Sequence, residues 1–279
     1  MVKIITDSTS DISQEMGREL GVTVIPLWVH FGKEEYQDGV TLYPAEFYAK
    51  LVKDKTFPTT AAPPPGLFAE AYDRLARETD EILCLVISAK YSATYDAAME
   101  GKELQKRKDC RVEIIDTLTA IGGQGLLTAI AAEEAKRGAN LDQIMDMIQR
   151  SIPKTYTRFC LDTLEYLHRG GRIGTAQAFL GSMLRFKPII GIIDGYTEGV
   201  ARVRSHTKAI DWLYNFVKGF SNIRALAVEY STIPENAETL AQRLGSIFPV
   251  DKIHRSIFSP VIGSHVGPRA IGIALVEQV

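Results

Sequence analysis

Short apolar stretches rich in β-branched residues alternate with helix-like segments along the first half of this sequence, and this alternation constrains the fold most strongly. The stretches at 2–6, 81–88 and 111–116 each lead into a segment with helical periodicity. Such alternation is typical of an open sheet of mostly parallel strands with helices on its faces. We therefore expect an α/β fold that begins with an open parallel sheet flanked by helices.

The second half repeats the alternation, with one sharp reversal of the chain. Asp194-Gly195 separates two apolar stretches and is typical of a tight turn between antiparallel strands. We expect a second α/β domain with a mixed sheet, and the short polar segment around Pro153 divides the chain into domains 1–152 and 153–279. Other expected elements are a strand at 22–31, a polar turn at 33–43, a helix at 119–138 and strands at 155–161, 187–194, 196–205, 223–230, 252–257 and 270–277.

The stretch Asp162-Thr-Leu-Glu-Tyr-Leu-His-Arg-Gly-Gly-Arg-Ile-Gly174 is the most distinctive motif. It predicts a short helix that its first two residues can cap and that Gly170-Gly171 ends, because glycine adopts the left-handed conformation of a helix C-cap without steric cost. A second helix is expected at 174–184. Arg172, held between the two helices, is placed to receive an anion, although a glycine cap followed by a solvated arginine has the same pattern.

Three other polar residues stand out by their settings. Three consecutive prolines hold the segment 57–66 extended, which fixes Thr60 in a stiff loop. Ser92 follows a buried strand, at the edge of an α/β sheet where ligands gather, and it can equally cap the next helix. His265 lies in a glycine-flanked loop at 259–268. Each of the three can also be read as an ordinary structural residue.

Together these segments occur in the order and approximate spacing of the DegV-like family, which the chain resembles from end to end. The specific signals are the motif at 162–174 and Gly-Ser-His-Val-Gly-Pro at 263–268, supported by Asp7-Ser-Thr-Ser-Asp11, Thr59-Thr60 and 88–95. Members of this family are two-domain α/β proteins that bind a long-chain fatty acid such as palmitate and, in many bacteria, present it to a fatty acid kinase. The resemblance implies a bacterial carrier with its ligand between the domains, no cofactor and no catalysis of its own.

The resemblance also assigns roles to four residues. It implies that Thr60 and Ser92 donate hydrogen bonds to the fatty-acid carboxylate, that His265 supports them, and that Arg172 faces the charge of an acyl phosphate. Guanidinium matches phosphate geometry, and imidazole can donate to a carboxylate. The chain departs from the family's pattern at four positions, which leaves the shape of the site open: Ala61, Ala62, Ala93 and Arg269.

A basic pair near the end of the hairpin is a candidate docking site. Arg202 and Arg204 can broaden a positively charged mouth or contact an acidic surface of the kinase, and a solvated face is an equal alternative. The kinase would supply the nucleotide site, since the sequence has no Gly-x-x-x-x-Gly-Lys-Ser/Thr loop. The segment Gly122-Gly-Gln-Gly125 lacks the third glycine of a dinucleotide loop and is interpreted as close helix packing.

The acyl tail requires an apolar tunnel. Burying one methylene contributes about 0.8 kcal/mol, so a tail of roughly 14 methylenes contributes about 11 kcal/mol before the cost of ordering. We therefore expect the acyl tail to supply most of the binding affinity and the carboxylate to fix the orientation of the ligand. The apolar candidates for the lining are Phe159, Leu164, Phe179, Met183, Leu184, 189–193 and 121–130.

The overall composition excludes several other classes of protein. The formal net charge of −2 gives no sign of nucleic acid or an anionic membrane as partner, and no apolar run is long enough to span a bilayer. The start of the chain enters a strand without the layout of a signal peptide, and three scattered cysteines do not suggest disulfides or a metal site. We expect a cytoplasmic protein without a metal ion.

Two other functions fit parts of the sequence. Ser92 and His265 could act as nucleophile and base of a hydrolase, although no serine lies in a Gly-x-Ser-x-Gly elbow. A binding module for another small anion, such as a phosphorylated metabolite, is the third possibility. The acidic residues of 7–11 are interpreted as turn and capping residues, because no second acidic cluster supports a metal site.

Overall fold

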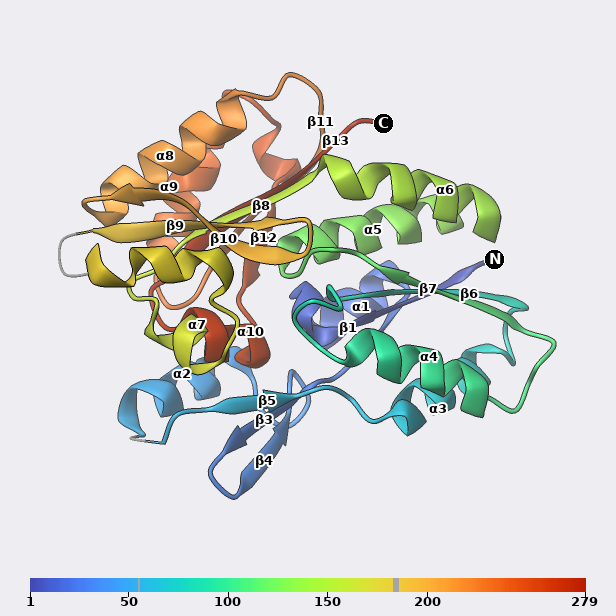
Figure 1. The fold of residues 1–279 in the computed structure, drawn as a ribbon. Coiled ribbons are helices and arrows are strands. Elements are labelled where there is room, and N and C mark those ends of the chain that lie inside the picture. The colour runs from blue at the N-terminus through green and yellow to red at the C-terminus, as the bar shows by residue number, and fades with distance from the viewer. Residues whose placement is uncertain (55, 183–185) are drawn as a thin grey trace.

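Four parallel strands form the core of the first half of the protein, as the alternation predicts (Figure 1). The computed structural model describes residues 1–54, 56–182 and 186–279. The strand order is β2-β1-β6-β7, and every neighbouring pair is parallel. The strands are β1 (Lys3–Asp7), β2 (Val22–Ile25), β6 (Glu81–Val86) and β7 (Arg111–Asp116).

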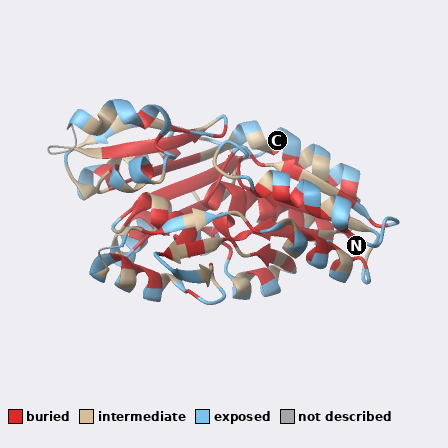
Figure 2. Ribbon diagram, turned by 60° about the horizontal axis from the view of Figure 1, so that its bottom comes forward, coloured by how far each residue is buried: buried red, intermediate tan, exposed pale blue. Residues whose placement is uncertain are grey.

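Helices cover both faces of this parallel sheet, since its strands are apolar on both sides. One face packs against α1 (Gln14–Leu20), α5 (Gly122–Lys136) and α6 (Leu141–Ser151). The other packs against α3 (Pro65–Leu75) and α4 (Thr94–Leu104). Buried residues follow the strands and the inner helix faces (Figure 2).

A mixed sheet of six strands forms the second half, which confirms that prediction. The order is β10-β9-β8-β13-β11-β12, antiparallel except for the pair β11–β12. The strands are β8 (Thr155–Cys160), β9 (Lys187–Ile193), β10 (Tyr196–Val203), β11 (Ile223–Tyr230), β12 (His254–Ile257) and β13 (Ile271–Glu277). Helices α8 (His206–Lys218) and α9 (Pro234–Leu244) cover its outer face.

Helix α5 joins the two halves, because it packs against both sheets (Figure 1). Leu126 and Ile130 of α5 share one apolar cluster with Leu83 of β6 and Ala274 of β13.

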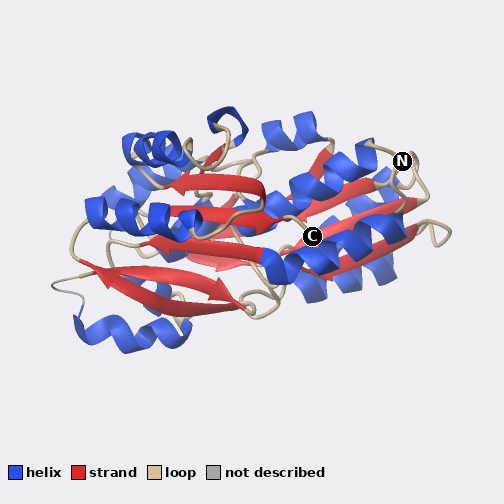
Figure 3. Ribbon diagram, turned by 90° about the horizontal axis from the view of Figure 1, so that it is seen from above, coloured by secondary structure: helices blue, strands red, loops and turns tan. Residues whose placement is uncertain are grey.

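The expected boundary after residue 152 falls in the short 3-10 helix η2 (Ile152–Lys154). The division 1–152 and 153–279 remains a prediction, and the core is continuous across it. Helices flank the strands on both sides (Figure 3).

A small third sheet corrects three predictions. The expected strand 22–31 is broken at Pro26, which cannot donate to a ladder, so that β2 joins the parallel sheet and β3 (Trp28–Phe31) leaves it. The expected turn 33–43 contains β4 (Glu34–Gln37), and the expected loop 57–66 contains β5 (Thr59–Ala61), both paired with β3. Helix α2 (Pro44–Lys53) packs against this sheet.

Helix boundaries differ from the predictions at four places. The helix expected from 119 begins at Gly122, since Ile121 has a φ of 62°. Helix α7 (Glu165–Arg169) starts one or two residues late, with Leu164 at its N-cap position, and 174–182 form a 3-10 helix, η3 (Gly174–Ser182), instead of an α-helix. Met183 and Leu184 lie outside the described residues. The expected loop 259–268 contains helix α10 (Pro260–Val266).

The glycines of 122–125 pack closely, as predicted. A Cβ on Gly125 would lie 2.5 Å from the carbonyl oxygen of Ser10, and one on Gly122 would lie 2.6 Å from a carboxylate oxygen of Glu229. Small residues therefore let α5 approach its neighbours. In the described part of the chain, no helix is both long and apolar enough to cross a bilayer.

Candidate functional site

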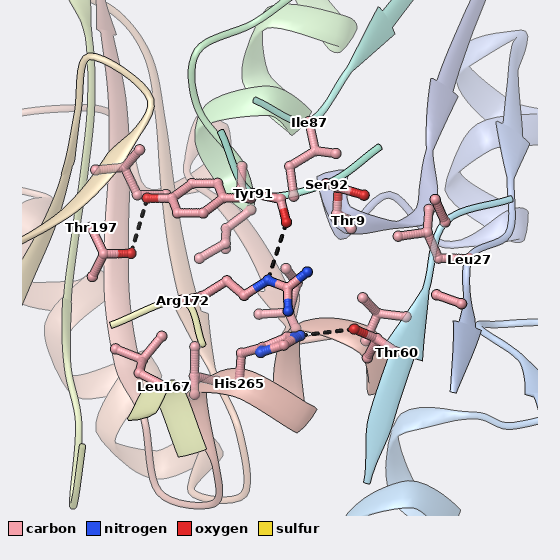
Figure 4. A pocket seen from close by; sticks show the side chains of 18 of the residues that line it. Thr9, Leu27, Thr60, Ile87, Tyr91, Ser92, Leu167, Arg172, Thr197 and His265 are labelled. Carbon is pink, nitrogen blue, oxygen red and sulfur yellow. Dashed lines mark hydrogen bonds between the residues drawn. The ribbon is translucent and has the colours of Figure 1, made fainter. Parts of the chain in front are cut away.

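A cavity of about 200 Å³ lies at the carboxyl ends of the parallel strands (Figure 4). Thr9 follows β1, Ile87 and Ser92 follow β6, and Ile121 follows β7, and all four line the cavity. β2 and β7 lie on opposite sides of the central pair β1–β6, so the sheet reverses its order there. Such a switch point is where open α/β sheets bind ligands.

The opposite wall comes from the second half of the chain. The mixed sheet contributes Phe159, Ile192 and Thr197, and α10 contributes Val261, Ile262, His265 and Val266. Leu167 of α7 and Arg172 complete this side. The cavity therefore has mostly apolar walls and a few polar side chains.

Thr60 and His265 meet at one side of the cavity. The Thr60 Oγ1 to His265 Nε2 distance is 2.9 Å. Thr60 is placed by β5, in register with Val29 of β3, and His265 is placed by the last turn of α10. A Cβ on Gly170 would collide with the imidazole, so glycine at this position makes room for His265.

His265 is uncharged at neutral pH. Removal of its ring from water lowers the pKa to about 4, and the positive charge of Arg172 adds to this effect. Its Nδ1 is buried and has no hydrogen-bond partner among the described residues. A neutral ring that carries its proton on Nε2 donates to Thr60 and leaves only a lone pair on Nδ1.

Ser92 lines the same cavity from the loop before α4. Its hydroxyl lies 2.8 Å from Thr94 Oγ1 and accepts a hydrogen bond from the Thr94 amide at 3.3 Å. The N-cap residue of α4 is Ala93, so the predicted N-cap serine is one residue early, although its oxygen still binds a first-turn amide.

Arg172 crosses the rim of the cavity (Figure 4). Its guanidinium is exposed, with Nε donating to the Tyr91 carbonyl at 3.1 Å and an Nη donating to the Gly170 carbonyl at 2.6 Å. Two carbonyls therefore hold the group in place, and its remaining N–H groups can bind an anion. Thr60, Ser92, Arg172 and His265, predicted from four distant segments, thus line one cavity.

The other predicted basic residues lie elsewhere. The Arg202 guanidinium lies 5.1 Å from the ring centroid of Phe179, and Arg204 lines a different surface pocket together with Lys208 of α8. Neither is among the described residues that line the cavity. Arg269 has a φ of 64°, a left-handed conformation that favours glycine.

Asp162 contacts three basic side chains instead of capping α7. Its carboxylate lies 2.7 Å from Lys187 Nζ, 2.7 Å from His206 Nε2 and 3.7 Å from Arg269 Nε. Burial raises the pKa of Asp162, but the bonds to Lys187 and His206 outweigh burial and lower it overall. Arg269 is thereby directed toward Asp162.

The apolar predictions agree with the cavity in part. Phe159, Ile121 and Ile192 line it, whereas Leu164 and Phe179 belong to the cluster of packed residues beside it. Ala61, Ala62 and Ala93 are lining residues. Of the α10 residues in the lining, His265 was predicted from the sequence, whereas Val261, Ile262 and Val266 were not, because 259–268 was expected to be a loop. Pro260 after Ser259 was the available signal for a helix start.

The residues of 7–11 form a buried turn, as interpreted. Asp7 accepts hydrogen bonds from the amides of Thr9 and Ile87 and from the Gln124 side chain. This carboxylate ties together the loops that follow β1 and β6. Within the described residues, no three His, Cys, Asp or Glu side chains are arranged to hold a metal ion.

The geometry does not favour a Ser-His hydrolase. His265 Nε2 is bonded to Thr60, while the hydroxyl of Ser92 is bonded to Thr94. A triad also needs a group that orients the base, and His265 Nδ1 has no such partner in the described part of the chain.

The fold and the site define a class of α/β proteins in which an apolar-walled cavity lies between a parallel and a mixed sheet, with hydroxyl and imidazole groups at one side. The sequence matches the DegV family over residues 1–278, and the chain belongs to that family. It is 35% identical to a DegV domain-containing protein of Halalkalibacterium halodurans, over 98% of this chain and 97% of the relative.

Solved structures of the family have the same fold. A fatty-acid-binding DegV family protein from Thermus thermophilus is 33% identical, with a TM-score of 0.90 over 99% of both chains. A stearic acid-binding protein from Eubacterium ventriosum is 26% identical, with a TM-score of 0.91 over 99% of this chain and 98% of the other. DegV of Bacillus subtilis, described as a fatty acid binding protein, is 28% identical, with a TM-score of 0.88 over 99% of both chains.

Proposed function

We propose that this protein binds a long-chain fatty acid, with the carboxylate at Thr60 and Ser92 and the tail along the apolar walls. The observation that carries the proposal is that these two hydroxyls, one on β5 and one on the loop before α4, line one mostly apolar cavity. Three related proteins of the same fold are described as binding fatty acids. A carboxylate removed from water needs donors, and an acyl tail needs apolar walls.

His265 orients the hydroxyl of Thr60 so that it can donate to the carboxylate. An uncharged imidazole that donates from Nε2 to Thr60 Oγ1 leaves the hydroxyl proton of Thr60 free to point at a carboxylate. Neutral donors hold the head without a tight ion pair. One carboxylate oxygen therefore keeps its nucleophilic character.

The tail must widen the cavity as it enters. Ligand sites usually enclose roughly 300–1,000 Å³, more than the cavity of about 200 Å³. We expect the apolar side chains around Phe159 and Ile192 to move apart when a long acid binds. The tail still supplies most of the affinity, at about 0.8 kcal/mol per buried methylene.

We further propose that the bound acid is the substrate of a partner kinase, so that this chain is a carrier and not an enzyme. A carboxylate oxygen attacks the γ-phosphorus of ATP held by the kinase, the bond to the β-phosphate oxygen breaks, and ADP leaves. Arg172, at the rim, binds the new acyl phosphate. The dependence on ATP places the carrier in the cytoplasm, and the exposed Arg202 and Arg204 are the proposed contacts for the kinase.

Lipid extraction tests the binding proposal. Purified protein is denatured and extracted, and the extract is examined by mass spectrometry. We expect a long-chain fatty acid in amounts comparable with the protein. An extract without fatty acid, together with no heat of binding when octadecanoic acid is titrated into the protein, would contradict the proposal.

The kinase step is tested separately. Protein loaded with octadecanoic acid is incubated with ATP and a bacterial extract, and hydroxylamine then converts any acyl phosphate to a hydroxamate. We expect hydroxamate only when extract and ATP are both present, and less with Arg172→Gln. Hydroxamate formed by ATP and the purified carrier alone would overturn the assignment as a carrier.

A further inference from the structure

A second pair of hydroxyls lies inside the cavity, away from Thr60 and His265. Tyr91 follows β6 and Thr197 lies on β10, and both line the cavity. The Thr197 Oγ1 to Tyr91 Oη distance is 3.1 Å. Figure 4 shows this pair on the opposite side of the cavity from the Thr60–His265 pair, with Arg172 between them.

The backbone holds Tyr91 in this position. Arg172 Nε donates to its carbonyl at 3.1 Å, and its amide donates to the Ser88 carbonyl at 2.9 Å. The ring extends from the rim into the cavity, where burial raises the pKa of the phenol. Thr197 is 3% exposed. Tyr91 and Thr197 thus form a fixed polar spot on an otherwise apolar wall.

This pair has one donor proton more than it uses. Two hydroxyls carry two protons, and their mutual hydrogen bond uses one. In the described part of the chain, Tyr91 Oη and Thr197 Oγ1 have no other hydrogen-bond acceptor. The second proton is therefore available inside the cavity. A buried hydroxyl donor without an acceptor is unfavourable, and a ligand oxygen beside the Tyr91–Thr197 pair would accept its hydrogen bond.

We propose that Tyr91 and Thr197 form a second polar subsite, which recognises an oxygen on the acyl chain of the ligand. The preferred class of ligand is then a long-chain acid that carries a hydroxyl or keto group part of the way along its tail. This inference rests on the proposed binding of fatty acids. An unsubstituted tail would leave the proton unpaired, whereas an oxygenated tail would accept it.

Positional isomers test the subsite. Octadecanoic acid and a series of hydroxyoctadecanoic acids that differ in the position of the hydroxyl are compared by competition with a fluorescent fatty acid. We expect one or two neighbouring positions to bind about five- to tenfold more tightly than octadecanoic acid, as one neutral hydrogen bond contributes. Equal or weaker binding of every isomer would overturn the subsite while leaving fatty-acid binding intact.

Two variants and a control locate the effect. Tyr91→Phe keeps the ring and removes the hydroxyl, so the preference for the oxygenated isomer should disappear, and Thr197→Val should reduce it. Tyr196→Phe is the matched control, since Tyr196 is 49% exposed and is not among the described lining residues. An unchanged preference in Tyr91→Phe overturns the inference. Failure of the wild-type protein to bind any of the acids overturns the proposed function and the inference with it.

Discussion

Thr60 and Ser92 reach one cavity by different routes, the first on an edge strand and the second on the loop before a helix. Thr60→Val and Ser92→Ala should each weaken binding of octadecanoic acid by about tenfold to a hundredfold, because a hydrogen bond to a charged group contributes about 1.5–3 kcal/mol. Competition with a fluorescent fatty acid measures the loss. Thr59→Val, at an exposed neighbour in β5, is the control. Unchanged affinity in both site variants would refute the placement of the head.

The charge state of His265 gives a second prediction at the residue scale. Its imidazole should titrate near pH 4, because burial and Arg172 both oppose protonation. In Arg172→Gln the pKa should rise, since one repulsive charge is gone. An NMR titration of the ring protons, assigned with a His265→Gln variant, checks both values. A pKa near 6.5 in the wild-type protein would show that the ring is solvated.

Local signals drew attention to Thr60, which lies beside the prolines, and to Ser92, which follows a strand end. Their assignment to the site came from the resemblance to the family, because each local pattern also fits an ordinary structural residue. The contact between Tyr91 and Thr197 had no such signal, because the residues are 106 positions apart and meet only through the packing of the two halves.

At the scale of an element, the two glycines after α7 have different roles. Gly170 has helical φ and leaves space for His265, whereas Gly171 has a φ of 71° and no atom near its absent side chain. Gly170→Ala should therefore displace His265 and weaken fatty-acid binding at least severalfold. Gly171→Ala should cost about 1–2 kcal/mol of stability through backbone strain and leave affinity nearly unchanged.

Urea denaturation and ligand competition, run on both variants, separate the two effects. Equal affinities in Gly170→Ala and Gly171→Ala would contradict the assigned role of Gly170.

The sequence motif predicted that the helix ends at Gly170-Gly171. It could not show that the first glycine serves a histidine 95 positions further along the chain, in a helix expected to be a loop.

At the scale of the whole molecule, buried carboxyl groups lie where the halves meet. Burial raises the pKa of Glu229 to about 8 and that of Asp38 to about 7, and burial with repulsion from Glu229 raises the pKa of Asp11. Asp11 accepts a hydrogen bond from the Ser259 amide at 3.0 Å and Asp38 one from the Val261 amide at 3.4 Å, at the start of α10.

From these raised pKa values we predict that the free energy of unfolding decreases as pH rises. Their folded pKa values lie above the unfolded values, so the folded state holds more protons, and the free energy of unfolding falls between about pH 4 and pH 8. The lowered pKa of His265 acts in the opposite direction, but only below about pH 6.5. Between about pH 6.5 and 7.5, above the ordinary pKa of histidine and below that of the thiols of Cys84, Cys110 and Cys160, the carboxyl groups therefore dominate the slope.

Urea denaturation across this range measures the slope. The wild-type protein should become less stable with increasing pH, and Glu229→Gln, which resembles the protonated acid, should show a smaller loss. Equal slopes in the two proteins would contradict the assignment of a protonated Glu229.

The two large sheets were predicted from the sequence, but the small third sheet and the packing between the two halves were not. Alternation of strands and helices predicted the parallel and mixed sheets. The third sheet was missed, because its strands are short and Pro26 separates β3 from an apparently continuous run. The cavity depends on how the halves pack through α5, and no local pattern specifies that packing.

A crystal structure of the protein with octadecanoic acid would show where the carboxylate and the tail bind. We predict the carboxylate within hydrogen-bond distance of Thr60 Oγ1 and Ser92 Oγ, and the tail along Phe159 and Ile192. A carboxylate bound elsewhere, or a tail outside this cavity, would contradict this prediction.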